Sequence, residues 1–167
     1  MTQAAEPGTR GTLQTLPGDD ARQIMWGFAD RYDTQMIVQA TRSVARSTVA
    51  RMVANGARNT HEWTTEKDDM LKAFDAAGIT AAFMEPEQGG FIEGPKNLAL
   101  ALIGFELAWV DGGAATTSLA SDLALAPIHE RGTEEQKQYY MTRCVPPGVD
   151  GVQWRGAFAL TEPLPYV

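Results

Sequence analysis

The fold is decided by the stretch Pro95-Lys96-Asn97-Leu98-Ala99-Leu100-Ala101-Leu102-Ile103-Gly104-Phe105-Glu106-Leu107-Ala108-Trp109-Val110. Its proline suits the first helical position, where the missing N–H has no partner to lose. At helical spacing the large apolar residues form two stripes, one through Leu102 and Phe105 and the other through Leu107. A helix that is apolar on nearly all sides lies in the middle of a bundle. We therefore expect Leu102, Phe105 and Leu107 to be buried.

Two further helices are predicted before this stretch. A short one spans residues 19–30, with acidic residues at its positive end and an apolar face of Ile24, Met25 and Phe28. A longer one runs from Asp33, as its N-cap, to about Asn55, where Asn55-Gly56 ends it. Residues 1–18 show no periodicity and predict a flexible lead-in.

Three arginines, Arg42, Arg46 and Arg51, fall on one side of the longer helix. They are compatible with an acidic or phosphate partner, or with a solvated helix face. We favour the solvated face, because exposed charged side chains are the ordinary case.

Between residues 60 and 94 the pattern predicts a helix, an extended piece and a loop. Thr64 or Thr65 caps a helix that ends near Ala77, with Gly78 as its stop. Residues 79–84 are apolar and are predicted to be extended. In the loop at 85–90, two adjacent glycines permit close approach of the backbone to a ligand or, as we favour, to a neighbouring helix.

The last predicted helices lie at about 114–131 and 133–144. Pro127 lies inside the first of them and is expected to kink or restart it. Thr133 and Gln136 form a capping box at the start of the second, which ends before Val145-Pro146-Pro147. Residues 19–144 therefore predict a mainly α fold, an orthogonal bundle of five to six helices.

The tail, residues 157–167, reads Ala-Phe-Ala-Leu-Thr-Glu-Pro-Leu-Pro-Tyr-Val. Its apolar part predicts a buried strand that enters a rigid turn, because Pro163 fixes its own φ and favours an extended Glu162. An apolar strand without a partner is an aggregation hazard. We therefore interpret the chain as an incomplete architecture.

Composition narrows the class of protein. The 167 residues include 14 Lys and Arg and 21 Asp and Glu, for a net charge of −7. This balance, without a basic run, argues against nucleic-acid or anionic-membrane partners. With a single cysteine, no transmembrane run and no signal peptide pattern, a cytoplasmic protein is predicted.

Few residues suggest chemistry by themselves. His61 lies in a polar connector and His129 in the last turn of a helix, too far apart for a metal-ligand pattern. Cys144 is expected to be a small buried residue rather than a nucleophile. No phosphate-binding, dinucleotide-binding or nucleophile-elbow motif is present.

One combination of motifs is more specific. The run Gly132-Thr133-Glu134-Glu135-Gln136-Lys137 is followed, after a Gly- and Pro-containing linker, by Phe158-Ala159-Leu160-Thr161-Glu162-Pro163. Upstream, a helix stop at Gly78, a Pro-x-x-x-Gly-Gly loop at 86–90 and the apolar helix follow in order. In order and spacing, these resemble the acyl-CoA dehydrogenase family over residues 33–163. The resemblance implies the family's N-terminal helical domain at 19–150 and the start of its middle β-domain at 151–167.

The resemblance also implies FAD as cofactor and an acyl-CoA thioester as substrate. In this family a glutamate removes the α-proton and the β-hydrogen leaves as hydride to the flavin. Phe158, Leu160 and Thr161 would match its flavin-contacting residues, with Thr161 offering hydrogen-bond groups. Without the resemblance, Phe158 and Leu160 would be interpreted as core residues.

Two departures from the family pattern matter. After Thr161-Glu162-Pro163 the family continues with small residues, whereas residues 164–167 are bulky. No glutamate of this chain matches the family's catalytic base, so we assign no catalytic residue. The first hypothesis is thus an N-terminal portion of an FAD-dependent dehydrogenase, inactive alone, that forms a homo-oligomer or joins the remaining part of a split enzyme. The alternative is a non-catalytic helical interaction module that pairs with a complete homologue.

Overall fold

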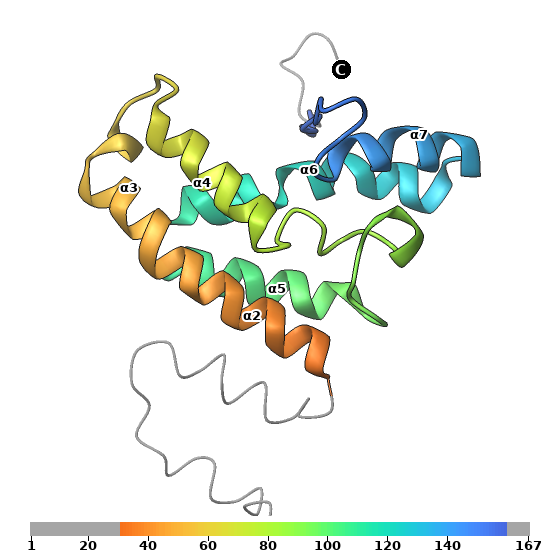
Figure 1. Ribbon diagram of the computed structural model, residues 1–167, viewed down its shortest axis with the longest axis horizontal. Coiled ribbons are helices and arrows are strands. Elements are labelled where there is room, and N and C mark those ends of the chain that lie inside the picture. The colour runs from red at the N-terminus through yellow and green to blue at the C-terminus, as the bar shows by residue number, and fades with distance from the viewer. Residues whose placement is uncertain (1–30, 160–167) are drawn as a thin grey trace, which may run out of the picture.

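Helix α5 (Lys96–Ala108) contacts both α2 (Tyr32–Val44) and α6 (Gly112–Arg131) in the structure, a computed structural model that describes residues 31–159 (Figure 1). Within this range the chain is mainly helical, which confirms the predicted bundle. Helix α4 (Thr65–Ala76) packs on the α2 side, and α7 (Glu134–Cys144) packs on α6. The predicted helix at 19–30 and the residues from Leu160 onward lie outside the described residues.

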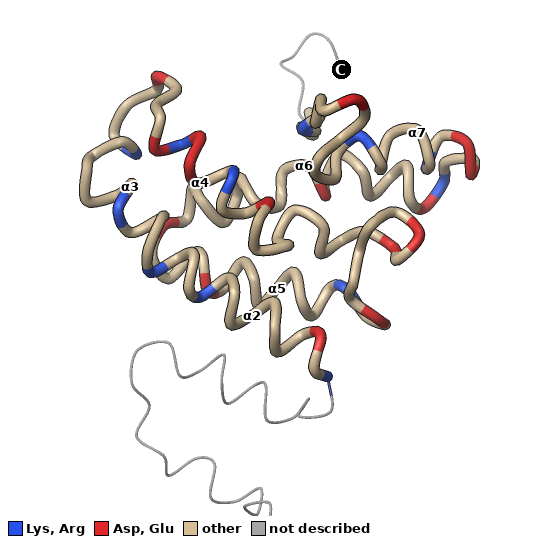
Figure 2. The backbone as a smooth tube through the Cα atoms, in the orientation of Figure 1, with Lys and Arg blue, Asp and Glu red and all other residues tan. Residues whose placement is uncertain are grey.

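One side of α5 is buried and the other is not. Leu102, Ile103 and Leu107 are at most 4% exposed. Phe105 and Trp109 are 36% and 50% exposed, so the predicted burial of Phe105 is wrong. The reason is geometric, because α5 turns only one strip of its wide apolar surface toward α2 and the core. Charged residues are also unevenly distributed. Figure 2 shows few of them on α5, whereas α2 to α4 carry both acidic and basic residues.

The first helical rod consists of α2, a π-helical segment (Ala45–Val49) and α3 (Ala50–Ala54). Gly56, with φ +76°, ends the rod as predicted. Asp33 is not the N-cap, because the helix already begins at Tyr32. Its carboxylate instead accepts hydrogen bonds from the Thr34 and Glu93 amides at 2.7 and 2.8 Å.

Arg42 does not lie on a solvated face as predicted. Its guanidinium donates to both carboxylate oxygens of Glu106 on α5, at 2.9 and 2.6 Å. Glu106 is 1% exposed, and a carboxylate buried in an apolar helix needs a compensating charge. Arg46 and Arg51 are exposed, in agreement with the solvated-face prediction.

The chain between α4 and α5 differs from the prediction. Thr64 is at the N-cap position of α4 and Gly78, with φ +77°, ends the helix, as predicted. Residues 79–84 are not extended; they form successive turns with amide-to-carbonyl bonds from Ala81 to Gly78 and from Met84 to Ala81. These turns satisfy the backbone locally, because no strand is available among the described residues.

The loop that follows contains a 3-10 turn, Pro86–Gln88. A Cβ at Gly90 would lie 1.9 Å from the Met84 carbonyl oxygen. The close approach at Gly90 is therefore to the same segment of chain, whereas a Cβ at Gly89 would lie 3.3 Å from Val145 Cγ1 at the end of α7, in agreement with the predicted approach to a neighbouring helix.

Both C-terminal helices begin with capping side chains. Asp111 accepts from the Ala114 amide at 2.8 Å at the start of α6, which continues through Pro127 without restarting. At α7, Gln136 N donates to Thr133 Oγ1 at 3.2 Å and Thr133 N donates to Gln136 Oε1 at 2.9 Å. The predicted capping box is thus confirmed.

Two apolar clusters hold the described residues together. The larger one joins α2, α3, α4 and α5. The smaller one lies where α7 packs on α6 and on residues 81–84, and it contains Met84, Leu125, Met141 and Cys144. Cys144 is 5% exposed, as the sequence predicted, and burial raises the pKa of its thiol.

Candidate functional site

The chain that leads to Phe158 is attached to the surface of α6 and α7. Trp154 N donates to the Arg143 carbonyl at 2.7 Å, and Gly156 N donates to Ser121 Oγ at 3.0 Å. A Cβ at Gly156 would lie 2.6 Å from Ala124 Cβ, so only glycine allows the segment to approach α6 this closely. This places the residues just before Phe158 beside α6.

The structure describes only one of the three predicted flavin-contacting residues. Phe158 is 48% exposed, while Leu160 and Thr161 lie outside the described range. Residues 153–159 pair with no strand within 31–159, so the predicted strand is not seen as far as Ala159. The isolated bridge in this part of the chain joins Val149 and Val152.

A groove of about 380 Å³ runs between α5 and α6. Its lining is mostly apolar and consists of Phe83, Asn97, Leu100, Ala101, Gly104, Leu119, Asp122, Leu123 and Ala126. Leu123 is 55% exposed, and Phe105 lies on the same helix as the groove residue Ala101. The α5–α6 face is therefore both hollowed and apolar, a combination typical of surfaces that bind a ligand or another protein segment.

Asp122 is the one carboxyl group in this groove. It is 7% exposed, and its Oδ2 atom has no hydrogen-bond partner among residues 31–159. Burial raises its pKa to about 7. A buried carboxyl with an unused oxygen favours a hydrogen-bond donor in whatever covers the groove.

An aromatic cluster lies on α7 near the start of the same segment. The Arg143 guanidinium carbon is 3.7 Å from the Tyr139 ring centre and 5.5 Å from the Trp154 ring. Tyr139, Tyr140 and Trp154 are each 40–46% exposed. Exposed Tyr, Trp and Arg side chains are enriched in protein interfaces.

A polar cluster joins the loop at 85–90 to the two helices. Glu85 accepts from Lys96 Nζ at 2.8 Å and lies 3.3 Å from His129 Nε2. The Lys96 hydrogen bond is the main reason that the pKa of Glu85 lies below its usual range. Nowhere in residues 31–159 do three or more His, Cys, Asp or Glu side chains gather as metal ligands would. The cluster is therefore a link between α5, α6 and the loop.

Comparison with known proteins gives the family. The model of the acyl-CoA dehydrogenase N-terminal domain matches residues 32–146. The chain belongs to the acyl-CoA dehydrogenase family. The matched range runs from the first residue of α2 to just beyond α7, so it coincides with the described helices.

A curated relative supports this assignment. The chain is 37% identical over 97 residues to "Acyl-CoA dehydrogenase, short-chain specific" of Megasphaera elsdenii. These residues are 57% of this chain and 24% of the relative, so the chain spans about a quarter of the dehydrogenase it matches. No solved structure matches the chain. None of the helices described in 31–159 has the length and apolar character needed to cross a bilayer.

The described residues provide only part of a site for the flavin that membership of the acyl-CoA dehydrogenase family implies. Phe158 offers one exposed aromatic face, which fits contact with a flat ring. The α5–α6 groove offers aliphatic side chains and the Asp122 carboxyl, which in its ionised form would repel the pyrophosphate of FAD. The residues between 31 and 159 thus fit contact with part of the cofactor and do not enclose it.

Sequence reasoning missed Asp122. Its signal is weak but readable, since it is the one charged residue in the otherwise uncharged stretch from Gly112 to His129. A single acidic residue in such a stretch lies either on the exposed side of its helix or at a buried position where it has a structural or functional role. Periodicity alone did not separate the two, because α6 is nearly uniform in polarity.

Proposed function

We propose that this chain supplies the N-terminal helical part of an FAD-dependent acyl-CoA dehydrogenase. The reaction is the α,β-dehydrogenation of an acyl-CoA thioester, with hydride transfer to the flavin. The observation that carries the proposal is the family match, which extends over residues 32–146. The relative from Megasphaera elsdenii supports the substrate class.

In this proposal residues 19–150 form the helical domain and residues 151–167 begin a β-domain. The change from helical to non-helical chain near residue 145 supports the division, because α7 ends at Cys144 and the described residues beyond it form no helix. Phe158, Leu160 and Thr161 would lie along the flavin ring, with Thr161 offering hydrogen-bond groups. The chain itself contributes no residue that we assign to proton abstraction.

The chain is proposed to be inactive by itself. A cofactor site gains its affinity by enclosing the ligand with convergent polar groups, whereas the described residues offer one exposed ring at this position. The apolar α5–α6 groove supports the same conclusion, because Leu123 in its lining is 55% exposed. Polypeptide corresponding to the rest of the relative would cover that groove and complete a homo-oligomeric or two-part enzyme.

A chimera tests the proposed function. Residues 32–146 replace the matching segment of the Megasphaera elsdenii dehydrogenase, and flavin content and acyl-CoA oxidation are measured with an artificial electron acceptor. Short acyl chains are tried first, because the name of the relative specifies them. We expect a folded chimera that retains flavin and turnover. A folded chimera without flavin, beside an active parent enzyme, would refute the proposal.

The second candidate is a non-catalytic module that pairs with a complete homologue. The exposed side chains of Tyr139, Tyr140 and Trp154, with the half-buried Arg143 beside them, favour it, since such side chains suit a protein partner. The same chimera separates the two candidates. An interaction module would not support turnover when it is built into the enzyme, whereas a catalytic N-terminal domain would.

A further inference from the structure

Asp75, in the last turn of α4, contacts the segment at residues 153–156. Arg155 Nη2 donates to Asp75 Oδ2 at 2.9 Å, and Gln153 Nε2 donates to Asp75 Oδ1 at 3.4 Å. Two backbone amides of the same segment attach it to α7 and to α6. The segment is therefore held by three helices, and Asp75 supplies its contact with α4.

The carboxylate of Asp75 is also held from within the helical domain. Thr80 Oγ1 donates to Asp75 Oδ1 at 2.6 Å, and Thr80 is 8% exposed. In the ion pair the side chain of Asp75 is 18% exposed and that of Arg155 is 34% exposed. Because Thr80 already restricts the carboxylate, less side-chain entropy is lost when Arg155 binds it than in an ordinary surface ion pair.

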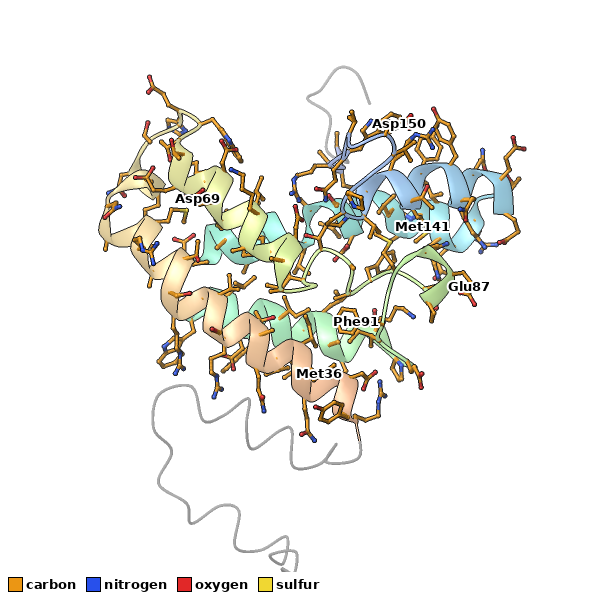
Figure 3. All side chains as sticks on the ribbon, in the orientation of Figure 1. Met36, Asp69, Glu87, Phe91, Met141 and Asp150 are labelled. Carbon is orange, nitrogen blue, oxygen red and sulfur yellow. The ribbon has the colours of Figure 1, made fainter. Side chains whose placement is uncertain are left out.

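Gln153 extends the contact from α4 to α7. Its Nε2 atom also donates to the carbonyl oxygen of Cys144, the last residue of α7, at 3.1 Å. Figure 3 shows Asp69 of α4 and Asp150, which closely precedes the segment, on different sides of the molecule. The amide of Gln153 thus connects the ends of two helices that belong to these two sides.

The attached segment ends close to Phe158. An extended residue spans at most about 3.6 Å, so Phe158 lies within about 7 Å of Gly156 along the chain. Contacts that fix residues 153–156 therefore also limit the positions that Phe158 can occupy. A group that binds a cofactor needs such support, because a displacement of about 1 Å is enough to weaken its contact.

We propose that Asp75 is a positioning residue for the flavin, because it holds Gln153 and Arg155 from the end of α4 and so determines where Phe158 contacts the ring. The inference rests on the proposed function, in which Phe158 is a flavin contact. Asp75 acts through the segment 153–156, and no contact of its own with the cofactor is required.

Hydrogen exchange in the 167-residue chain tests whether Asp75 holds the segment. Asp75→Asn keeps the size of the side chain and removes the charge that pairs with Arg155. The amides of Trp154 and Gly156 should exchange about three- to tenfold faster in this variant. Asp69→Asn, exposed on the same helix, is the matched control and should leave both amides unchanged. The amides of α5 show whether each variant is folded.

A longer chimera tests the effect on the flavin. Residues 32–159 of this chain replace the N-terminal part of the Megasphaera elsdenii dehydrogenase, so that the segment 153–156 is included. Asp75→Asn should raise the dissociation constant of FAD about three- to tenfold and, at saturating FAD, change the visible absorption spectrum of the bound flavin. Asp69→Asn should change neither. A merely structural role would lower the yield of folded chimera without altering the spectrum of the flavin that is bound.

Arg155 completes a double-mutant cycle. Arg155→Gln should have effects similar to those of Asp75→Asn, and the double variant should add little, because all three remove the same ion pair. Additive effects would overturn the proposal, as would an Asp75→Asn variant with the exchange or the flavin spectrum of the parent. A folded parent chimera without flavin would instead refute the proposed function, and the positioning role with it.

Discussion

At the scale of single residues, Asp122 is a buried carboxyl group whose Oδ2 atom has no hydrogen-bond partner among residues 31–159. Its pKa is raised to about 7 from 3.8 by burial, so the folded chain holds its proton more tightly than the unfolded chain. The stability that this proton confers is complete below pH 4 and is lost as the pH rises toward 7. Above pH 7 a charged Asp122 is a net cost to the fold.

Asp122→Asn should therefore raise the free energy of unfolding at pH 8 and change it little at pH 4. About three pKa units correspond to an upper limit of about 4 kcal/mol. Denaturant unfolding at the two pH values measures the difference. Asp69→Asn, on the exposed side of α4, is the matched control and should stay within about 0.5 kcal/mol at both. A variant that is less stable than the parent at pH 8 would contradict this assignment.

The Arg42–Glu106 pair gives a second prediction at this scale. Arg42→Leu leaves the Glu106 carboxylate buried without its partner and should cost about 3–5 kcal/mol. The double change with Glu106→Leu should recover most of that loss, because it removes the stranded charge. Arg46→Leu is the control, with an effect within about 0.5 kcal/mol. Thermal or urea unfolding measures the stability of each variant. Equal destabilisation of the single and the double variant would contradict this prediction.

At the scale of elements, α5 has buried apolar residues on one side and exposed apolar residues on the other. Leu107→Ala should cost about 2–5 kcal/mol, because it opens a cavity in the main core. Phe105→Ala should cost less, about 1–2 kcal/mol, since over a third of this residue is already exposed. Urea unfolding of the two variants gives the comparison, and a larger loss for Phe105→Ala would place that ring in the core after all.

The start of α7 supports a prediction about capping. Thr133→Ala removes the acceptor of the Gln136 amide and should cost about 1 kcal/mol. Thr116→Ala, at an exposed position in α6, should cause no loss because alanine has the higher helix propensity. Equal melting temperatures for the parent and Thr133→Ala would show that the capping box does not stabilise the chain.

The elements differ in how far the sequence predicted them. The capping box at Thr133 and the glycine stops at Gly56 and Gly78 were predicted, because local chemistry determines them. The pairing of Arg42 with Glu106 and the exposure of Phe105 were not, because both depend on which helix lies alongside. Residues 79–84 were predicted to be extended and are not, since a short apolar run fits an extended segment or buried turns equally well.

At the scale of the whole molecule, the described residues form a helical domain with two uncovered apolar areas. One is the α5–α6 groove with Asp122, and the other is a groove lined by Met36, Ile37, Gln39, Ala40, Ala77 and Phe91. The family resemblance was predicted from the motifs at 132–137 and 158–163, and the family match confirms it. The groove containing Asp122 was not predicted, because it is formed by residues from two helices and the connection before α5.

Titration of the purified 167-residue chain with FAD, followed by flavin fluorescence, tests the central claim most directly. Binding at a micromolar dissociation constant requires about 8 kcal/mol, which one exposed aromatic face does not supply. We predict no saturable binding in this range and no oxidation of acyl-CoA by the chain alone, while the chimera binds FAD in the same titration. Tight binding of FAD together with turnover by the chain alone would contradict the account.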